Sequence, residues 1–231
     1  MSKSISIKSI ISRYIINIII DHRSKVHNLV GPYNNDIISI IYGSLLGDAF
    51  AERRKGGKGT RICFYQEGSH KDYLLYLHSL IANLGYCNTN IPKIKPRLGV
   101  NGKIRYIIRF STWTYTTFNW ILDDWYVNGV KKIPRSLKYY LTPLALAIWI
   151  MDDGGKVGSG LKLLTNCFDL NDLEFLISLL KDKYDLHSSI QSAGVDNQYF
   201  IYIWAESMPK LVEIVRPYII PSMKYKFGKY I

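Results

Sequence analysis

The sequence is poor in acidic residues and in cysteine. Its 231 residues carry 18 Asp and Glu against 30 Lys and Arg, which gives a formal net charge of +12. A chain this basic favours a polyanionic partner, and nucleic acid fits better than a membrane surface. The three cysteines, Cys63, Cys87 and Cys167, are widely spaced and odd in number, which excludes a disulfide framework and predicts buried, reduced thiols. The five histidines are scattered as well, so we expect no zinc site and expect any metal to be held by carboxylates.

Long apolar runs are absent. The most apolar stretch, from Ile10 to Ile20, is interrupted by Arg13, Tyr14 and Asn17 and falls short of the ~20 residues that cross a bilayer. We therefore expect no membrane association. The chain does contain 48% hydrophobic and 13% aromatic residues, which is enough for a folded core. Alanine is scarce while isoleucine, asparagine and tyrosine are abundant, a bias typical of A+T-rich genomes, which include those of organelles such as mitochondria.

The predicted elements occur twice in the same order. The first series is a helix over 36–50, a hairpin over 51–66, a helix over 70–85, a hairpin over 92–112 and a helix over 114–126. The second is a helix over 142–153, a hairpin over 156–166, a helix over 168–185, a hairpin over 187–207 and a helix over 208–219. Apolar periodicity and turn residues support these elements. The sequence therefore predicts an α+β fold made of two pseudo-symmetric α-β-β-α-β-β-α half-domains.

This duplication divides the chain into four segments. We expect a basic N-terminal extension over 1–30, a first half-domain over 31–127, a linker over 128–140 and a second half-domain over 141–231. The first 20 residues contain Lys3, Lys8 and Arg13 but no acid, which suits either a mitochondrial presequence or an amphipathic N-terminal helix.

The first helix of each half is suited to close packing. Asp36 is the expected N-cap of one helix, and Thr142 is the expected N-cap of the other, with Pro143 at its first position. The small residues Gly43 and Gly47 allow a second helix to approach closely. We therefore expect the two helices to pack against each other across a pseudo-twofold axis.

Each of these helices ends in acid, at Asp48 in the first half and at Asp152 and Asp153 in the second. Close packing would bring the carboxylates together, where like charges and the negative helix C-termini repel them. A bound divalent cation would offset both repulsive effects, and Mg²⁺ prefers oxygen ligands of this kind. Two carboxylates beneath a phosphodiester form a suitable site for phosphoryl hydrolysis. A single acid at a helix end is commonly solvated, but paired copies in a repeat favour a site.

Two sequence segments resemble a known motif. GSLLGDA in the first half and LTPLALAIWIMDDGGK in the second are similar to the paired motifs of the LAGLIDADG homing endonucleases, in the group that carries both motifs on one chain. The first copy departs from the motif at Gly47 and Ala49 but keeps its acid. The similarity extends over about residues 36–227, including FYQEGSHKDYLLYL and IIPSMKYK, and leaves residues 1–30 outside.

The resemblance implies a saddle of two four-stranded antiparallel sheets that straddles the major groove of double-stranded DNA. The motif helices form its central interface. Asp48 and Asp153 would bind Mg²⁺, with Mn²⁺ as a substitute, and Asp152 would contribute from beside them. Asp48 and Asp153 would also serve as catalytic residues.

Family members also place a basic residue near each scissile phosphate, where it stabilises developing charge. The resemblance assigns this role to Lys226 in the second half and to Lys131 in the first, with Lys132 and Lys138 as open alternatives. Phosphate anchoring without a catalytic role is an equal alternative for these lysines. Gln66 and Asn166 occupy matched strand ends beside the expected site and are candidates for ordering water.

Basic and amide side chains mark the expected DNA surface. The first-half candidates are Arg53, Arg54, Lys55, Lys58, Arg61, Lys93, Lys95, Arg97, Lys103, Arg105 and Arg109. The second-half candidates are Gln191, Asn197, Gln198 and Tyr199. Phosphate contacts would supply affinity, while arginine and amide side chains would read bases. The five tryptophans, Trp113, Trp120, Trp125, Trp149 and Trp204, are expected in the core.

Three functions are consistent with these features. The leading prediction is a monomeric, Mg²⁺-dependent endonuclease that cuts both strands of a long asymmetric DNA target during intron homing. The alternative is an RNA maturase that binds its host intron RNA and assists group I splicing. A transcriptional regulator is a weaker third prediction, because the sequence shows no helix-turn-helix extension. Retention of both acids favours cleavage.

Overall fold

The computed structural model describes residues 34–231, so the predicted N-terminal extension over 1–30 lies outside the described residues. The first half comprises α2 (Asn35–Leu46), β1 (Phe50–Arg53), β2 (Thr60–Glu67), α3 (Lys71–Asn83), β3 (Lys95–Leu98), β4 (Ile104–Ser111) and α4 (Asn119–Trp125). The second comprises α6 (Pro143–Asp153), β7 (Gly154–Val157), β8 (Gly160–Leu164), α7 (Leu170–Tyr184), β9 (Ser188–Ser192), β10 (Tyr199–Ile203) and α8 (Met208–Val215). Between them lie β5 (Tyr126–Val127), β6 (Val130–Lys131) and α5 (Leu137–Tyr140).

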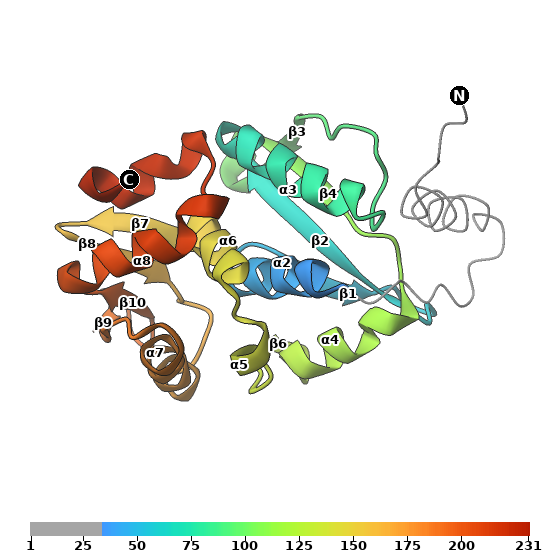
Figure 1. The fold of residues 1–231 in the computed structure, drawn as a ribbon. Helices are drawn as coiled ribbons and strands as arrows, with labels where there is room; N and C mark the ends of the chain where they lie inside the picture. Colours follow the sequence, from blue (N-terminus) through green and yellow to red (C-terminus); the bar gives the residue numbers. More distant parts are fainter. Residues whose placement is uncertain (1–33) are drawn as a thin grey trace, which may run out of the picture.

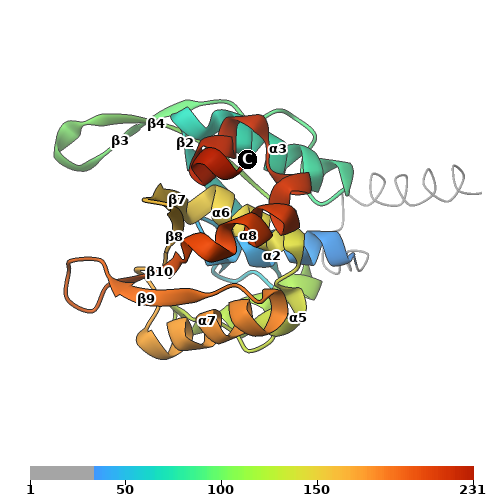
Figure 2. The same ribbon diagram turned by 60° about the vertical axis from the view of Figure 1, so that its left-hand side comes forward.

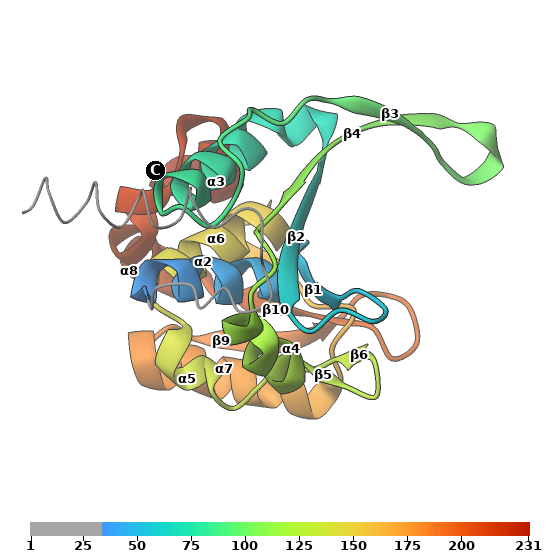
Figure 3. The same ribbon diagram turned by 90° about the vertical axis from the view of Figure 1, so that its right-hand side faces the viewer.

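The predicted α+β duplication is confirmed. Each half contributes one four-stranded antiparallel sheet, in the orders β1-β2-β4-β3 and β7-β8-β10-β9. Figure 1 shows α2 and α6 side by side at the centre, between the two sheets. Figure 2 shows that the β3–β4 and β9–β10 hairpins extend to the same side of the molecule. Figure 3 shows how far the β3–β4 hairpin reaches beyond the helices.

Local signals explain where α2 and α6 begin. Thr142 caps α6 as predicted, because its side chain accepts a hydrogen bond from the amide of Ala145. The prediction that Asp36 caps α2 is wrong. The N-cap is Asn34, which has an extended backbone and whose Oδ1 accepts from the amides of Asp36 at 2.7 Å and Ile37 at 3.2 Å. Asp36 lies instead in the first turn, where its charge favours the helix N-terminus.

The two motif helices are in backbone contact because glycine lies between them. A Cβ atom added to Gly43 would lie 2.4 Å from the carbonyl oxygen of Ala145, and one added to Gly47 would lie 2.5 Å from the Cβ atom of Asp152. Both distances are shorter than any real carbon contact, so only glycine fits at these two positions of the interface. The expected close packing of the motif helices is thereby confirmed, and it brings their acidic ends together.

Gly43→Val is expected to lower the melting temperature by about 5–10 °C. The added atoms would push against the backbone of α6, and overpacking of a tight core typically costs ~1–3 kcal/mol, or ~2–4 °C per kcal/mol in a protein of this size. Thermal unfolding followed by circular dichroism measures the change. Ala82→Val, on the half-buried face of α3, is the control for valine in a helix. Equal melting temperatures for the two variants would contradict this account of the interface.

The tryptophan predictions hold only in part. Trp125 and Trp149 are fully buried, which confirms their place in the core, and Trp113 is half-buried. Trp120 is 39% exposed and Trp204 is 40% exposed, so the core prediction is wrong for both. Trp120 packs one side against the rings of other aromatic residues near α5, while Trp204 follows β10 and donates its indole N–H to the hydroxyl of Ser189.

The three cysteines are free thiols in different surroundings. Cys87 is buried as predicted, whereas Cys63 is half-buried and Cys167 is exposed, so the prediction of buried thiols is wrong for these two. Cys63 lies on the outer face of β2, opposite Phe50, and Cys167 lies in the loop that follows β8. Within residues 34–231, no helix is both long enough and apolar enough to cross a membrane.

Candidate active site

Gln66 joins the acidic ends of the two motif helices. Asp48 follows the end of α2, and Asp152 and Asp153 are the last two residues of α6. The side-chain amide nitrogen Nε2 of Gln66 donates to Asp48 Oδ2 at 2.7 Å and to Asp152 Oδ1 at 3.0 Å. Gln66 lies near the end of β2 and is almost fully buried. Its carboxamide therefore spans the interface and fixes one carboxylate from each half.

The site is strongly unfavourable for negative charge. The pKa of the Asp153 carboxyl is raised to about 7, mainly by burial and next by the charge of Asp48, while Lys226 and Lys131 act in the opposite direction. Burial likewise raises the pKa of the Asp152 carboxyl well above its usual range, with contributions from Asp48 and Asp153. Gathering three carboxyl groups at two helix C-termini thus costs free energy. A bound cation would offset this cost.

The donor chemistry fits a hard divalent cation. Asp48 and Asp153 offer the oxygen ligands that Mg²⁺ and Mn²⁺ accept. Among residues 34–231, no group of three or more His, Cys, Asp and Glu side chains is arranged to hold a metal ion alone. Such a site would be completed by water and by oxygen atoms of a substrate, as Mg²⁺ sites on phosphate substrates commonly are.

Two lysines cap the motif helices in matching positions. Lys226 is buried, and its Nζ donates to the carbonyl oxygens of Asp152 at 2.9 Å and Ile150 at 3.2 Å, with Met151 as a third acceptor. Lys131 is half-buried in β6, and its Nζ donates to the carbonyl oxygens of Ala49 at 2.9 Å and Gly47 at 3.3 Å.

Each of these ammonium groups donates to carbonyls at or just after a helix C-terminus, and each brings positive charge beside the carboxylates. Burial lowers the pKa of both ammonium groups, against the opposing effect of the nearby acids.

The other two first-half candidates lie elsewhere. Lys132 pairs with Asp169 at the start of α7, and the Nζ of Lys138 lies 4.8 Å from the centre of the Tyr139 ring. The geometry therefore favours Lys131 as the counterpart of Lys226. A catalytic role for either lysine stays a prediction.

The predicted partner of Gln66 in the second half does not repeat its contacts. Asn166 is exposed, and its Nδ2 donates to Gln198 Oε1 at 3.0 Å. The reason is local: β8 ends at Leu164, two residues before Asn166, whereas Gln66 is still within its strand. The sequence analysis overlooked His70, whose Nδ1 lies 3.2 Å from Gln66 Oε1. The available signal was the four-residue spacing in the segment QEGSH.

Strand register collects basic side chains on one face of the first sheet. Residues directly opposite each other on neighbouring strands point to the same side. The pairs Tyr65 with Arg109 and Arg97 with Arg105 therefore place three arginines on the face opposite the buried side chains. Arg61 and Lys95 share this face by the same alternation. The outer face of the sheet thus carries these five basic residues together with Glu52, Glu67 and Ile107.

Most of the predicted DNA contacts are accessible. Those that are exposed are Arg53, Arg54, Lys55, Lys58, Lys93, Lys95, Arg97, Lys103, Arg105, Arg109, Gln191 and Asn197. Arg61, Gln198 and Tyr199 are half-buried. Three of the arginines are paired with acids: Arg61 with Glu52, Arg105 with Glu67 and Arg53 with Asp123. The pairs of Arg53 and Arg105 are exposed and therefore weak, so they leave these two arginines available to an anionic partner.

The outer face of the second sheet is less basic. Register places Lys162, Tyr202 and Ser189 side by side on it, and Phe200 beside Gln191. Lys162 was not among the predicted contacts, and it is the one basic residue of β8. The two sheets therefore offer unequal charge to a polyanion.

Fold and site together define a class of protein: one chain whose two similar halves bring their acidic helix ends together between two sheets. The chain belongs to the LAGLIDADG DNA endonuclease family, whose model matches residues 38–211. This confirms the resemblance noted from the two motifs.

Related proteins include some named as maturases and one named as an endonuclease. The chain is 56% identical over 227 residues to the cytochrome b mRNA maturase bI2 of Saccharomyces cerevisiae, covering 95% of this chain and 54% of that protein. It is 58% identical over 208 residues to the protein of the same name in Debaryomyces hansenii, covering 90% of this chain and 79% of that protein. It is 41% identical over 150 residues to the intron-encoded endonuclease ai4 of Dictyostelium discoideum, covering 62% and 93%. The chain thus spans about half the length of the Saccharomyces relative.

Solved structures share the fold. The homing endonuclease I-WcaI bound to its DNA recognition sequence matches with a TM-score of 0.76 and 25% identity, covering 97% of this chain and 95% of that one. A set of mesophilic variants of the homing endonuclease I-DmoI matches with a TM-score of 0.50 and 17% identity, covering 78% and 95%.

Proposed function

We propose that the chain is a site-specific endonuclease that cuts both strands of double-stranded DNA in the presence of Mg²⁺. The observation that carries this proposal is the proximity of Asp48 and Asp153 at the ends of two helices packed through glycine, with a lysine beside each end, the half-buried Lys131 and the buried Lys226. The basic outer face of the first sheet supports a DNA partner. The structural likeness to I-WcaI, a DNA-bound homing endonuclease, supports the same partner.

In this proposal the chain contributes binding, charge and orientation. Asp48 and Asp153 would hold the cation, which when bound would activate water and stabilise the leaving oxygen of the phosphodiester. Lys131 and Lys226 would stabilise the extra negative charge of the transition state. Gln66 would hold the Asp48 carboxylate in place through its 2.7 Å hydrogen bond. Both motifs lie on one chain, so we propose that a monomer cuts both strands.

Site specificity can be tested on a plasmid. Since two relatives are named for cytochrome b mRNA, the first target to test is the intronless cytochrome b coding sequence, and a mitochondrial setting is part of the proposal. We expect one cut per plasmid at one sequence, mapped by sequencing both ends, and no cut in a plasmid that carries the same sequence scrambled. Equal cutting of the two plasmids would refute site-specific cleavage.

Neutralising Arg53, Arg54 and Lys55 together is expected to weaken DNA binding more than neutralising Lys156, Lys162 and Lys224. The first set lies on the more basic half, and each lost phosphate contact makes the plot of log affinity against log salt less steep by about 0.9. The first triple variant should therefore lose about two to three units of slope and at least about tenfold more affinity than the second. Wild-type affinity and slope in the first variant would show that this cluster does not face DNA.

A second candidate function is assistance of intron splicing. The observation that favours it is the 56–58% identity to two proteins named mRNA maturases. A basic surface does not separate RNA from DNA, so both activities are compatible with it. Splicing of a precursor RNA containing the host intron, with and without protein, tests this function. If a variant that lacks both the Asp48 and the Asp153 carboxylates still makes splicing faster than in the absence of protein, the assistance of splicing does not depend on the cleavage site.

A further inference from the structure

The carboxamide of Gln66 has a complete set of partners. Its two Nε2 hydrogens are used by Asp48 Oδ2 and Asp152 Oδ1, so only the oxygen Oε1 remains to face a third group. That group is the ring nitrogen Nδ1 of His70, 3.2 Å away. Because Oε1 can only accept, the hydrogen of the imidazole must be on Nδ1. The partners of Gln66 thus determine the tautomer of His70.

This hydrogen bond selects one orientation of the carboxamide. The terminal torsion of glutamine has broad, roughly twofold preferences, so the oxygen and nitrogen ends can exchange by a half-turn. A half-turn would place Oε1 against two carboxylates and Nε2 against the Nδ1 hydrogen of His70. The donor on His70 therefore acts together with the two acids to hold Nε2 toward them. The 3₁₀ turn Gly68–His70 makes this contact possible, because it folds the chain back directly after β2.

The second half has no matching device. Asn166, the counterpart of Gln66, donates to Gln198 and is exposed. The residue four positions after Asn166 is Leu170, whose side chain cannot donate a hydrogen bond. The two proposed metal ligands therefore differ in their support: Asp48 accepts directly from the buried amide of Gln66, which is itself held by His70, whereas in the second half this amide reaches Asp152 rather than Asp153 and Asn166 points elsewhere.

We propose that His70 is a positioning residue that orients Gln66, and through it the Asp48 carboxylate, so that the two DNA strands depend unequally on His70. The unequal strand dependence rests on the proposed endonuclease function. The orientation of Gln66 by His70 is a property of the protein without DNA and does not depend on that function. Two variants separate donor loss from loss of packing: His70→Ala removes the donor, and His70→Asn keeps an N–H donor close to the place of Nδ1.

The positioning is tested without DNA or metal by NMR of the Gln66 side-chain amide, assigned by its loss in Gln66→Met. We expect the amide hydrogens of Gln66 to exchange with solvent about tenfold faster in His70→Ala than in the wild type, because one hydrogen bond of typical strength has been removed. In His70→Asn the exchange rate should stay within about twofold of the wild type. Unchanged exchange in His70→Ala would overturn the proposal.

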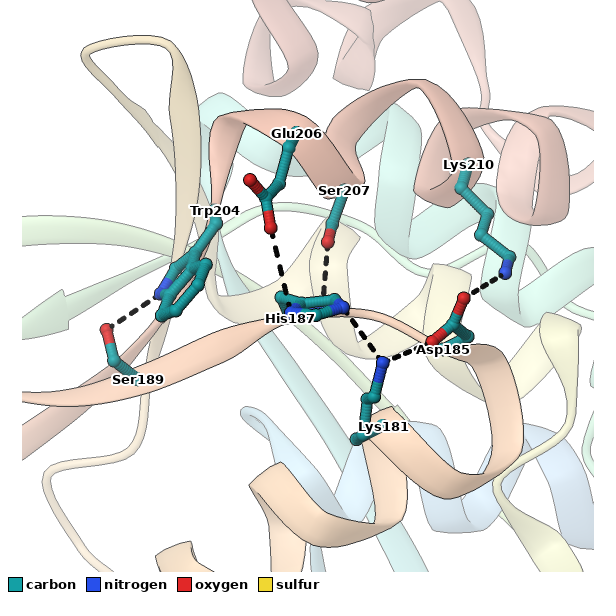
Figure 4. A network of polar contacts seen from close by, with 8 residues as sticks. All are labelled: Lys181, Asp185, His187, Ser189, Trp204, Glu206, Ser207 and Lys210. Carbon is teal, nitrogen blue, oxygen red and sulfur yellow. Dashed lines mark hydrogen bonds and ion pairs between the residues drawn. The ribbon is translucent and has the colours of Figure 1, made fainter.

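The strand dependence is tested by single-turnover cleavage of a DNA target labelled on both strands. We expect His70→Ala to slow one strand about tenfold and the other by less than about twofold, and His70→Asn to restore the slow strand. His187→Ala is the matched control. That histidine also contacts charged neighbours, Lys181 at 2.8 Å and Glu206 at 3.6 Å, but in a separate network at the end of α7 (Figure 4).

Equal slowing of both strands by His70→Ala would show a general structural role and overturn the unequal dependence, as would wild-type rates for both strands. If the wild-type protein cuts no DNA at all, the proposed function fails. The exchange measurement then decides the positioning role by itself.

Discussion

Asp48→Asn and Asp153→Asn are each expected to lower the single-turnover rate of DNA cleavage by at least ~1000-fold. Replacing a carboxylate by an amide removes a charged ligand for the cation and keeps the size of the side chain, so the loss falls on phosphoryl transfer. DNA affinity should stay within about threefold of the wild type or rise slightly, because a negative charge near the phosphates has been removed. Gel-shift titration and quenched-flow cleavage measure the two quantities.

Asp152→Asn is the matched control for these variants. Asp152 lies in the same interface and accepts from Gln66, but its place in the motif corresponds to Gly47, which has no acid. We expect a rate loss of less than about tenfold, because the amide oxygen can still accept the hydrogen bond. A larger loss in Asp152→Asn than in Asp153→Asn would show that the acid of the second half has been misassigned.

Lys226→Met is expected to slow the chemical step by about 100-fold with little change in DNA affinity or in its salt dependence. An ammonium group beside a developing charge in a buried site is worth ~10²–10³ in rate, whereas a phosphate anchor acts on affinity. The variant should also melt at a lower temperature, because the carbonyls of Met151 and Asp152 lose the hydrogen bonds that they accept from Lys226.

One measurement and one control variant separate these effects. Single-turnover rates at saturating protein, measured well below the melting temperature, report the chemical step alone. Lys224→Met, an exposed neighbour on the same segment, is the control for loss of charge. If Lys226→Met cleaves at the wild-type rate under these conditions, the lysine acts only as a helix cap.

The pattern of the sequence was sufficient for the architecture. The apolar helices, the glycine turns and the repeated order predicted the hairpins of each half and the helix pair, while the two four-stranded sheets were implied by the family resemblance. Asn101 and Gly102, within the predicted hairpin over 92–112, both have positive φ, of 59° and 72°, a conformation that Asn-Gly turns between strands favour. Such local signals depend on backbone preferences of one or two residues, which the sequence displays directly.

Contacts between distant segments were harder to predict. The hydrogen bond between Gln66 and Asp152 depends on where the end of β2 lies relative to the end of α6. No pattern of residues in the sequence predicts this position. The repeat suggested that Asn166 would act like Gln66, but β8 stops two residues too early. The helix-capping contacts of Lys226 and Lys131 also emerged only when the C-terminal segment and β6 were placed beside α6 and α2.

Exposure was the other weak point of the sequence reading. Trp120, Trp204 and Cys167 are residue types that are often buried, yet the two tryptophans lie at the border of an element and Cys167 lies in a loop, where part of the residue is left uncovered. Residue type predicts average burial, whereas the actual burial depends on which neighbouring element covers that position.

The most direct test of the central claim is linearisation of a supercoiled plasmid that carries the intronless target, with the wild-type chain in Mg²⁺ and in EDTA. We expect full conversion to one linear product in Mg²⁺ or Mn²⁺, none in EDTA, and none with Asp48→Asn or Asp153→Asn. The claim would be contradicted if the wild-type chain bound the target tightly but produced no linear plasmid with any divalent ion, or if the two aspartate variants cut it as fast as the wild type.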